Sequence, residues 1–263
     1  MTKPTTTQPT CRVAPLPKLT WSGHAWEATV TIRAWAGFQA RGGPYTARSS
    51  RRPSTGRVRL SVAAPGGEPT QRPTSEQAAA FAFLLANQDA IRDAVLPKLL
   101  REYRRARKQR IEDGDDDDEI DFDAWLDQDD PDAPMAWVSR ALPDLKTPAA
   151  LREVMGLGIV HILAAARGGV AFVGLEFGCD WDDEHGAGAM LHRARVLKVG
   201  GADTSFLTWI ATRARHDPAQ AAQAEGGESV VDDVEGGSLV ADEEHALAAG
   251  EMVADDVGDG LAL

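Results

Sequence analysis

The sequence predicts an α+β domain in which a mostly antiparallel sheet is packed by one long amphipathic helix. Three observations lead to this fold class. Apolar and polar residues alternate in two early segments, apolar residues recur every three or four positions after Thr74, and two apolar runs in the second half flank a glycine turn. With 263 residues, 43% of them hydrophobic, the chain is long enough to bury a sizeable core.

We expect the chain to be divided into a leader, a domain with an insertion, and a tail. Residues 1–18 are rich in Thr and Pro and predict a disordered leader, and residues 19–212 form the domain. An acidic run interrupts the domain at about 112–134 and predicts a disordered insertion. Residues 213–263 predict a disordered acidic tail, which could also recruit partners as a scaffold.

Alternation of apolar and polar residues predicts a first strand within residues 21–35 and a second over 58–62, and we expect the two to pair antiparallel. Residues 37–54 between them are rich in Gly, Arg and Ser and predict a loop. The sequence Pro65-Gly66-Gly67 forms a turn that ends the second strand.

Thr74 marks the predicted start of the helix, because its hydroxyl can accept a backbone N–H while Gln77 completes a capping box. Apolar residues from Phe81 to Tyr103 keep a spacing of three or four, so one face of the helix is apolar. Pro97 is expected to kink or split the helix, since an internal proline loses a backbone hydrogen bond and clashes with the preceding turn. The remainder, up to Arg110, is a basic amphipathic extension.

The second half of the domain predicts a short helix followed by strands. Thr147 and Pro148 open the helix, with proline at the first helical position. Residues 157–165 and 170–177 form a hairpin around Arg167-Gly168-Gly169, and residues 187–192 and 195–199 are shorter strands. We expect a helical turn with four apolar residues to close the core: Phe206, Leu207, Trp209 and Ile210.

Composition and charge restrict the function classes. No run of about 18 apolar residues and no secretory signal is visible, so we expect a cytoplasmic protein without a membrane span. The net charge of -12 argues against general nucleic-acid binding, although residues 1–67 carry many arginines against the single acid Glu27 and leave local basic patches open. Cys11 and Cys179 are too few for a disulfide framework and are expected to be reduced.

The most distinctive segment is residues 174–188, GLEFGCDWDDEHGAG, and several chemical interpretations of it are open. Cys179 could be a nucleophile with His185 as its base, although a cysteine that ends a packed strand is more often a small buried apolar residue. Glu176 and Glu184 could form an acid and base pair. A zinc site is a further alternative, but the segment lacks a second close ligand pair. Its candidate ligands are Cys179, Asp182, Asp183, Glu184, His185 and His192.

The acidic run near residue 113 matches part of the pattern of a calcium-binding loop. Asp113, Asp115 and Asp117 occupy the first, third and fifth positions of such a loop. However, Asp118 stands where glycine is needed for the sharp turn, and Ala124 stands where a glutamate should close the site. The pattern therefore does not predict a calcium site.

We favour a structural interpretation of the distinctive segment. Trp181 would fold back over the end of the sheet, and Asp182 would accept backbone amides within a turn. His185 would orient the turn through a hydrogen bond. Gly186 and Gly188 would permit backbone angles or close approach that a side chain forbids.

The same segment carries a resemblance to a known family. Its most specific part is the string CxWDxEHG, and the likeness covers roughly residues 21–209. The residues that carry it are Gly174-Leu175-Glu176-Phe177, Cys179, Trp181, Asp182, Glu184, His185, Gly186, Gly188, Val199-Gly200 and Ala202-Asp203. Together they resemble the bacterial family called domain of unknown function 6985. The resemblance implies an intracellular bacterial protein similar to immunity-type proteins encoded among toxin and defence clusters, with no established activity.

Two functional hypotheses follow. The first is a non-enzymatic cytoplasmic binding protein of the immunity or antitoxin type, which engages a basic protein such as a nucleic-acid-cleaving toxin through an acidic surface. The second is a metal-dependent hydrolase that uses Asp182, Glu184 and His185. Under the first hypothesis we expect no catalytic residue, metal or cofactor, and the binding residues are those of the motif: Cys179, Trp181, Asp182, Glu184, His185 and Gly186.

Overall fold

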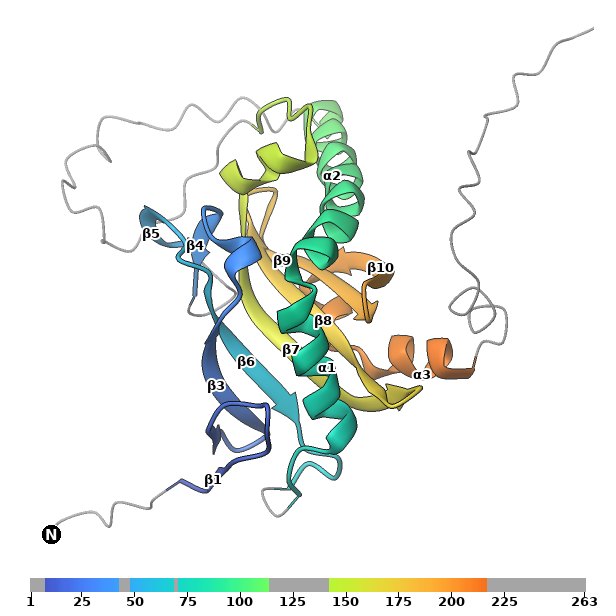
Figure 1. Ribbon diagram of the computed structural model, residues 1–263. Helices are drawn as coiled ribbons and strands as arrows, with labels where there is room; N and C mark the ends of the chain where they lie inside the picture. The colour runs from blue at the N-terminus through green and yellow to red at the C-terminus, as the bar shows by residue number, and fades with distance from the viewer. Residues whose placement is uncertain (1–7, 43–47, 69–70, 114–141, 217–263) are drawn as a thin grey trace, which may run out of the picture.

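The computed structural model describes residues 8–42, 48–68, 71–113 and 142–216, and its architecture is α+β (Figure 1). The strands are β1 (Thr10–Cys11), β2 (Leu19–Trp21), β3 (Ala25–Thr31), β4 (Gln39–Arg41), β5 (Arg48–Pro53), β6 (Arg57–Ala63), β7 (Met155–Arg167), β8 (Val170–Cys179), β9 (Asp182–His192) and β10 (Arg195–Gly201). The helices are η1 (Arg33–Trp35), α1 (Ser75–Ala86), α2 (Gln88–Asp113), η4 (Pro148–Glu153), η5 (Ala202–Ser205) and α3 (Thr208–His216), where η denotes a 3-10 helix.

The main sheet is large and mixed. Its strands lie in the order β1-β2-β3-β6-β7-β8-β9-β10, while β4 and β5 form a separate pair. β3 and β6 are antiparallel, as predicted, but β6 and β7 are parallel, which the sequence analysis did not anticipate. Parallel neighbours need a long crossover, and here the segment that carries α1, α2 and η4 provides it. This crossover places α1 and α2 over one face of the sheet (Figure 1).

The helix start at Thr74 is confirmed. Its hydroxyl accepts from the backbone N–H of Gln77 at 3.3 Å, and the Gln77 side-chain oxygen accepts from the backbone N–H of Thr74 at 2.9 Å. The Gln77 side chain is also fully buried and donates to the carbonyl oxygens of Ala63 and Leu163. The capping residue therefore also ties α1 to β6 and β7.

The predicted helix is present as two helices, and it is not split at Pro97. The break falls at Asn87, between α1 and α2, and Pro97 lies inside α2. The Asn87 side chain donates to the carbonyl oxygen of Phe83 at 2.9 Å, and its own carbonyl accepts from the N–H of Ile91. An asparagine side chain competes in this way with the helical backbone, which explains why the helix is interrupted there.

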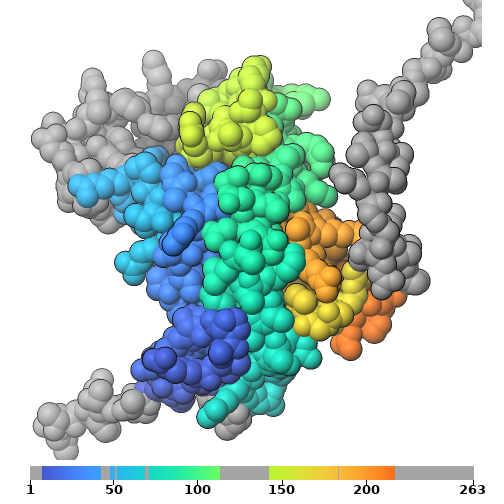
Figure 2. All heavy atoms as spheres, viewed as in Figure 1, coloured from blue at the N-terminus to red at the C-terminus, as the bar shows by residue number. Residues whose placement is uncertain are grey.

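The main core lies between the sheet and the two helices. Its largest fully buried side chains include Trp26, Trp35, Tyr103 and Phe177. In the space-filling view, α1 and α2 lie directly against the N-terminal segments on one side and against η4 above (Figure 2). A second, smaller apolar cluster joins α3 to the sheet through Leu163, Phe172, Met190, Ile210, Ala211 and Ala214.

Only part of the predicted closing turn enters the core. Ile210 is buried, whereas Phe206 and Trp209 are 47% and 50% exposed. A helix presents residues three and four apart on one face, so α3 buries Ile210, Ala211 and Ala214 and turns Trp209 outward. The ammonium of Lys198 lies 4.8 Å from the centre of a Trp209 ring.

Two other segments differ from expectation. Part of the predicted disordered leader is structured, because Thr10 and Cys11 form β1 and Leu16 is buried. The predicted loop at 37–54 contains β4 and β5. The acidic insertion and tail, apart from the ends of α2 and α3, lie outside the described residues. No helix in the described ranges has the length and apolar character needed to cross a membrane.

Candidate functional site

The distinctive segment forms a tight hairpin between β8 and β9. Cys179 pairs with Asp182, so Asp180 and Trp181 make the turn. The predicted hairpin between β7 and β8, with its turn at Gly168 and Gly169, is also present and lies at the other end of β8. The Asp180 N–H donates to the carbonyl oxygen of Val154 at 2.8 Å, which holds the motif turn against the start of β7.

Asp180 is the centre of a polar network that the sequence did not reveal. Its two carboxylate oxygens accept from Arg41 and from the Gln39 side chain, the latter at 2.7 Å. Gln39 also donates to the carbonyl oxygen of Glu153 at 2.7 Å and accepts from Arg41. Gln39 and Arg41 both belong to β4, so the network fastens this short strand to the motif turn.

Trp181 packs on the opposite side of the turn. Its ring meets that of Tyr103 edge to face, with centroids 5.4 Å apart. Tyr103 is fully buried in α2 and donates its hydroxyl to the carbonyl oxygen of Pro143. Burial raises the pKa of Tyr103 to about 12, so this hydroxyl stays protonated at neutral pH. The turn is thus held between β4 and α2.

Asp182 and His185 contact each other at the start of β9. The carboxylate of Asp182 accepts from the backbone N–H of His185 at 2.9 Å and lies 3.2 Å from its ring Nδ1. Gly186 follows with a φ of +68°, a conformation that glycine adopts without strain. The structural interpretation expects such features, namely an Asp182 carboxylate that accepts a backbone N–H and a glycine at an unusual backbone angle.

The environment of Cys179 does not favour its interpretation as a nucleophile. Cys179 is fully buried, and desolvation raises the pKa of its thiol well above the usual range. Its sulfur contacts the carbonyl oxygen of Asp182 at 3.4 Å, whereas the His185 side chain is 75% exposed. A thiol in this environment behaves as a small apolar side chain.

The other proposed side chains are also dispersed. Glu176 lies 2.7 Å from the Nε2 of His161, and His192 contacts the carbonyl oxygens of Arg167 and Val170 at the far end of β8. Within residues 8–42, 48–68, 71–113 and 142–216, no three His, Cys, Asp or Glu side chains cluster closely enough to hold a metal ion. Asp113 ends α2, and the rest of the tested calcium loop lies outside the described residues.

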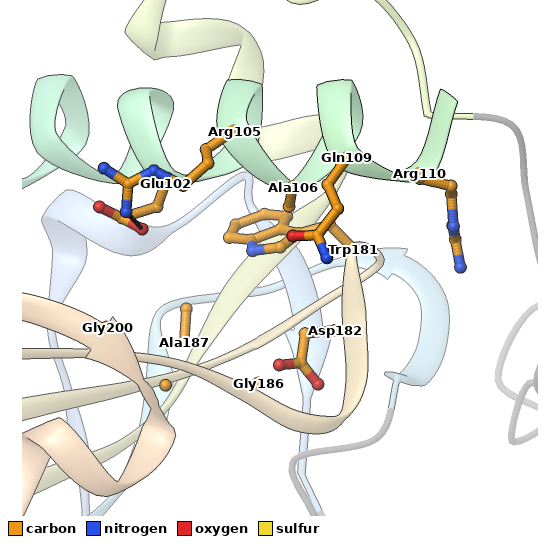
Figure 3. Close-up of a pocket in the computed structure, with 11 residues that line it drawn as sticks. Glu102, Arg105, Ala106, Gln109, Arg110, Trp181, Asp182, Gly186, Ala187 and Gly200 are labelled. Carbon is orange, nitrogen blue, oxygen red and sulfur yellow. Dashed lines mark hydrogen bonds and ion pairs between the residues drawn. The ribbon is translucent and has the colours of Figure 1, made fainter. Parts of the chain in front are cut away.

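A polar groove of about 460 Å³ opens beside the hairpin (Figure 3). Three of the predicted binding residues line it, namely Trp181, Asp182 and Gly186, whereas Cys179, Glu184 and His185 do not. The indole of Trp181 lies below Ala106 of α2, and the Gln109 amide points toward the hairpin (Figure 3). The other lining residues were not predicted from the sequence as binding residues: Glu102, Arg105, Ala106, Gln109, Arg110, Ala187, Gly200 and Gly201.

The groove carries charges of both signs. Arg105 forms an ion pair with Glu102 at 3.2 Å, one helical turn away on α2, and Asp182 lies across from them on β9. In the sequence, the basic helical pattern that ends near Arg110 was the feature that could have indicated the groove residues of α2. It could not indicate what α2 faces, because that contact depends on the path of the chain between helix and hairpin.

The charge of the described body is opposite to that of the whole chain. The described ranges hold 26 Lys and Arg against 16 Asp and Glu, a formal net charge of +10, while the whole chain has -12. The other 24 acidic residues belong to segments 114–141 and 217–263. The expectation of an acidic surface therefore does not apply to the described part of the domain.

The fold and the groove define an α+β domain in which a tight hairpin is fastened between a short strand and a long helix. A model of the family described as a domain of unknown function, DUF6985, matches residues 55–207, and the chain belongs to this family. The match spans β6 to η5 and includes the motif hairpin, while β4 precedes it. No curated protein and no solved structure is significantly similar to the chain.

Proposed function

We propose that this protein is a non-enzymatic binding protein and that a partner docks in the groove between α2 and the β8–β9 hairpin. The observation that carries this proposal is the half-buried Trp181 on the groove wall, with Arg105 and Arg110 on the facing helix. Tryptophan and arginine are enriched among the residues that dominate binding energy at protein interfaces. A groove that combines them with Glu102 and Asp182 suits a partner with its own mixed polar surface.

The motif supports binding better than catalysis. Asp182 and His185 contact each other, Cys179 is buried, and Asp180 is engaged by β4. These contacts hold the hairpin, and a rigid hairpin presents Trp181 in a defined orientation. A pre-organised contact residue improves affinity because less conformational freedom is lost on binding.

The partner that we propose is a basic protein, with a nucleic-acid-cleaving toxin as the first class to test because of the resemblance to immunity-type proteins. Attraction of a basic partner would come from the acidic segments 114–141 and 217–263, since the described body is itself cationic. Complementary charge of this kind mainly accelerates association and selects partners. A bacterial cytoplasmic location is part of the proposal, and the free state of Cys11 and Cys179 supports it.

The test compares groove variants in a capture experiment. Immobilised full-length protein would be exposed to bacterial lysate, the captured protein identified, and the interaction reconstituted from purified components. Trp181→Ala should weaken the reconstituted complex by roughly tenfold or more. Trp209→Ala is the matched control, because this half-exposed tryptophan lies on α3 and does not line the groove. Equal affinity of wild type and Trp181→Ala would contradict the proposal.

The alternative, a metal-dependent hydrolase that uses Asp182, Glu184 and His185, has less support. Glu184 and His185 are exposed and neither lines the groove. Metal analysis of protein purified without chelator separates the two proposals. Stoichiometric zinc or manganese, lost together with hydrolytic activity in His185→Ala, would favour the hydrolase.

A further inference from the structure

A second cavity, of about 180 Å³, lies on the other side of the sheet from α1 and α2. Val58, Leu60 and Val62 of β6 point into the main core. Side chains alternate along a strand, so Arg57 and Arg59 project from the opposite face. The cavity is lined by β3, β4, β6 and β7, through Thr29, Arg41, Gly42, Arg57, Val58, Arg59, Gly158 and Ile159.

Among the residues that the structure describes, the lining is basic and contains no acidic side chain. Arg57 and Arg59 are exposed, and no carboxylate of the described ranges forms an ion pair with either. The carboxylates that share this face of the sheet have other neighbours. Glu27 lies 3.9 Å from His24, and Glu176 lies 2.7 Å from His161.

Arg41 forms the fixed wall of the cavity. Its side chain is only 5% exposed, and its contacts with Asp180 and Gln39 hold it in place. Asp180 balances its charge, so within the described ranges the unbalanced charge of the cavity comes from Arg57 and Arg59. The Nε of Arg41 is buried and has no hydrogen-bond acceptor within the described part of the chain. A buried donor of this kind is destabilising until an acceptor is supplied.

We infer that this cavity binds the phosphate group of a phosphomonoester. Such a group carries a charge of about -1.5 to -2 at neutral pH, which matches the two unbalanced arginines. Arginine donates pairs of hydrogen bonds to phosphate oxygens, and Arg57 and Arg59 lie two residues apart on one strand, a separation of about 6.6 Å. The cavity is smaller than the roughly 300 Å³ of typical small-molecule pockets, so it suits one anionic group rather than a whole ligand.

The neighbouring residues suit such a group. Thr29 on β3 brings a hydroxyl, which can donate to or accept from a phosphate oxygen. Gly42 and Gly158 add no side chain, so the space between the arginines stays open. The inference does not depend on the groove at Trp181, because none of the groove residues lines this cavity.

Titration calorimetry of the full-length protein at low ionic strength tests the inference. The probes are inorganic phosphate, glycerol 3-phosphate, acetate and a short DNA duplex. The test variant is the double substitution Arg57→Gln/Arg59→Gln, which changes exposed side chains and should leave the fold intact. The control is Arg33→Gln/Arg101→Gln, which removes the same charge from exposed arginines outside the cavity.

We expect saturable binding of phosphate and glycerol 3-phosphate that is about tenfold or more weaker in the test variant and nearly unchanged in the control. Both ligands should also raise the unfolding temperature of the wild type but not of the test variant. Absence of saturable phosphate binding would overturn the inference. So would an equal loss in both variants, or binding of the duplex alone, since these results would indicate general electrostatic attraction.

Discussion

Arg41 forms an ion pair with Asp180, which lies 139 residues later in the chain. The Arg41 side chain is 5% exposed and that of Asp180 is 22% exposed, so the pair is largely shielded from water. It joins β4 to the turn of the family motif and also forms one wall of the basic cavity. One interaction therefore connects the stability of the motif hairpin with both candidate binding sites.

Asp180→Ala should lower the free energy of unfolding by about 3 kcal/mol, because the buried guanidinium of Arg41 and the amide of Gln39 both lose an acceptor. Denaturant titration measures the change. Glu112→Ala, which removes an exposed ion pair with Lys108, is the control and should change the value by less than about 1 kcal/mol. Similar effects of the two substitutions would show that the Arg41 pair is not structurally important.

Gly174→Ala should destabilise the fold by about 3 kcal/mol, because the added methyl group would overlap the carbonyl oxygen of Ser205. The clash is between β8 and the backbone of η5, so relief requires η5 to move. Gly42→Ala is the matched control, since among the described residues the nearest atom to its added methyl group would be the Ser49 hydroxyl oxygen, 3.9 Å away. Thermal unfolding of both variants would reveal the difference, and equal midpoints would argue against close packing of η5.

Cys179 should resist alkylation by iodoacetamide at pH 8 in the native protein. It is fully buried, and burial raises the pKa of its thiol, so the reactive thiolate is scarce and inaccessible. Mass spectrometry of the modified peptides provides the measurement, and protein unfolded in denaturant is the control in which the thiol should react. Rapid modification of the native thiol would restore the nucleophile interpretation.

Stability should fall as the pH drops below about 6.5, the ordinary pKa of histidine. Desolvation lowers the pKa of His192 in the folded state, so the unfolded chain binds a proton first as the pH falls. The contribution of His192 is therefore complete above pH 6.5 and is lost as the pH falls through its folded pKa. His192→Gln should flatten this dependence in thermal unfolding curves recorded from pH 7 to pH 5.

His24→Gln is the control for the pH experiment, because His24 is 80% exposed. This variant should keep the wild-type pH dependence. If both histidine variants behave alike, groups other than His192 control the acid response.

Local features of the fold were predictable from the sequence. The capping box at Thr74 and Gln77 and the glycine turn after Arg167 each involve residues a few positions apart, and the structure has both. The helix break was not predicted correctly, because the proline rule pointed to Pro97, whereas the side chain of Asn87 competes with the helical backbone. Local rules compete, and the sequence does not show which prevails.

The net charge of the whole chain led to the expectation of an acidic surface, which does not apply to the described body. The value of -12 averages over segments 114–141 and 217–263, while the described body has +10. The charge of a protein surface can be predicted only when it is known which charged residues lie on that surface. The argument against general nucleic-acid binding used this average, whereas the arginines of residues 1–67 left local basic patches open, and Arg57 and Arg59 belong to that region.

By itself, the sequence determined the α+β class, the capped start of α1 and the hairpin between β7 and β8, because hydrogen bonds and side-chain periodicity within a few residues specify them. Only the tertiary structure decided which motif residues face the groove, what holds Asp180, and where Arg57 and Arg59 meet Arg41. These relations join residues far apart in the chain, and such contacts depend on the packing of whole strands and helices.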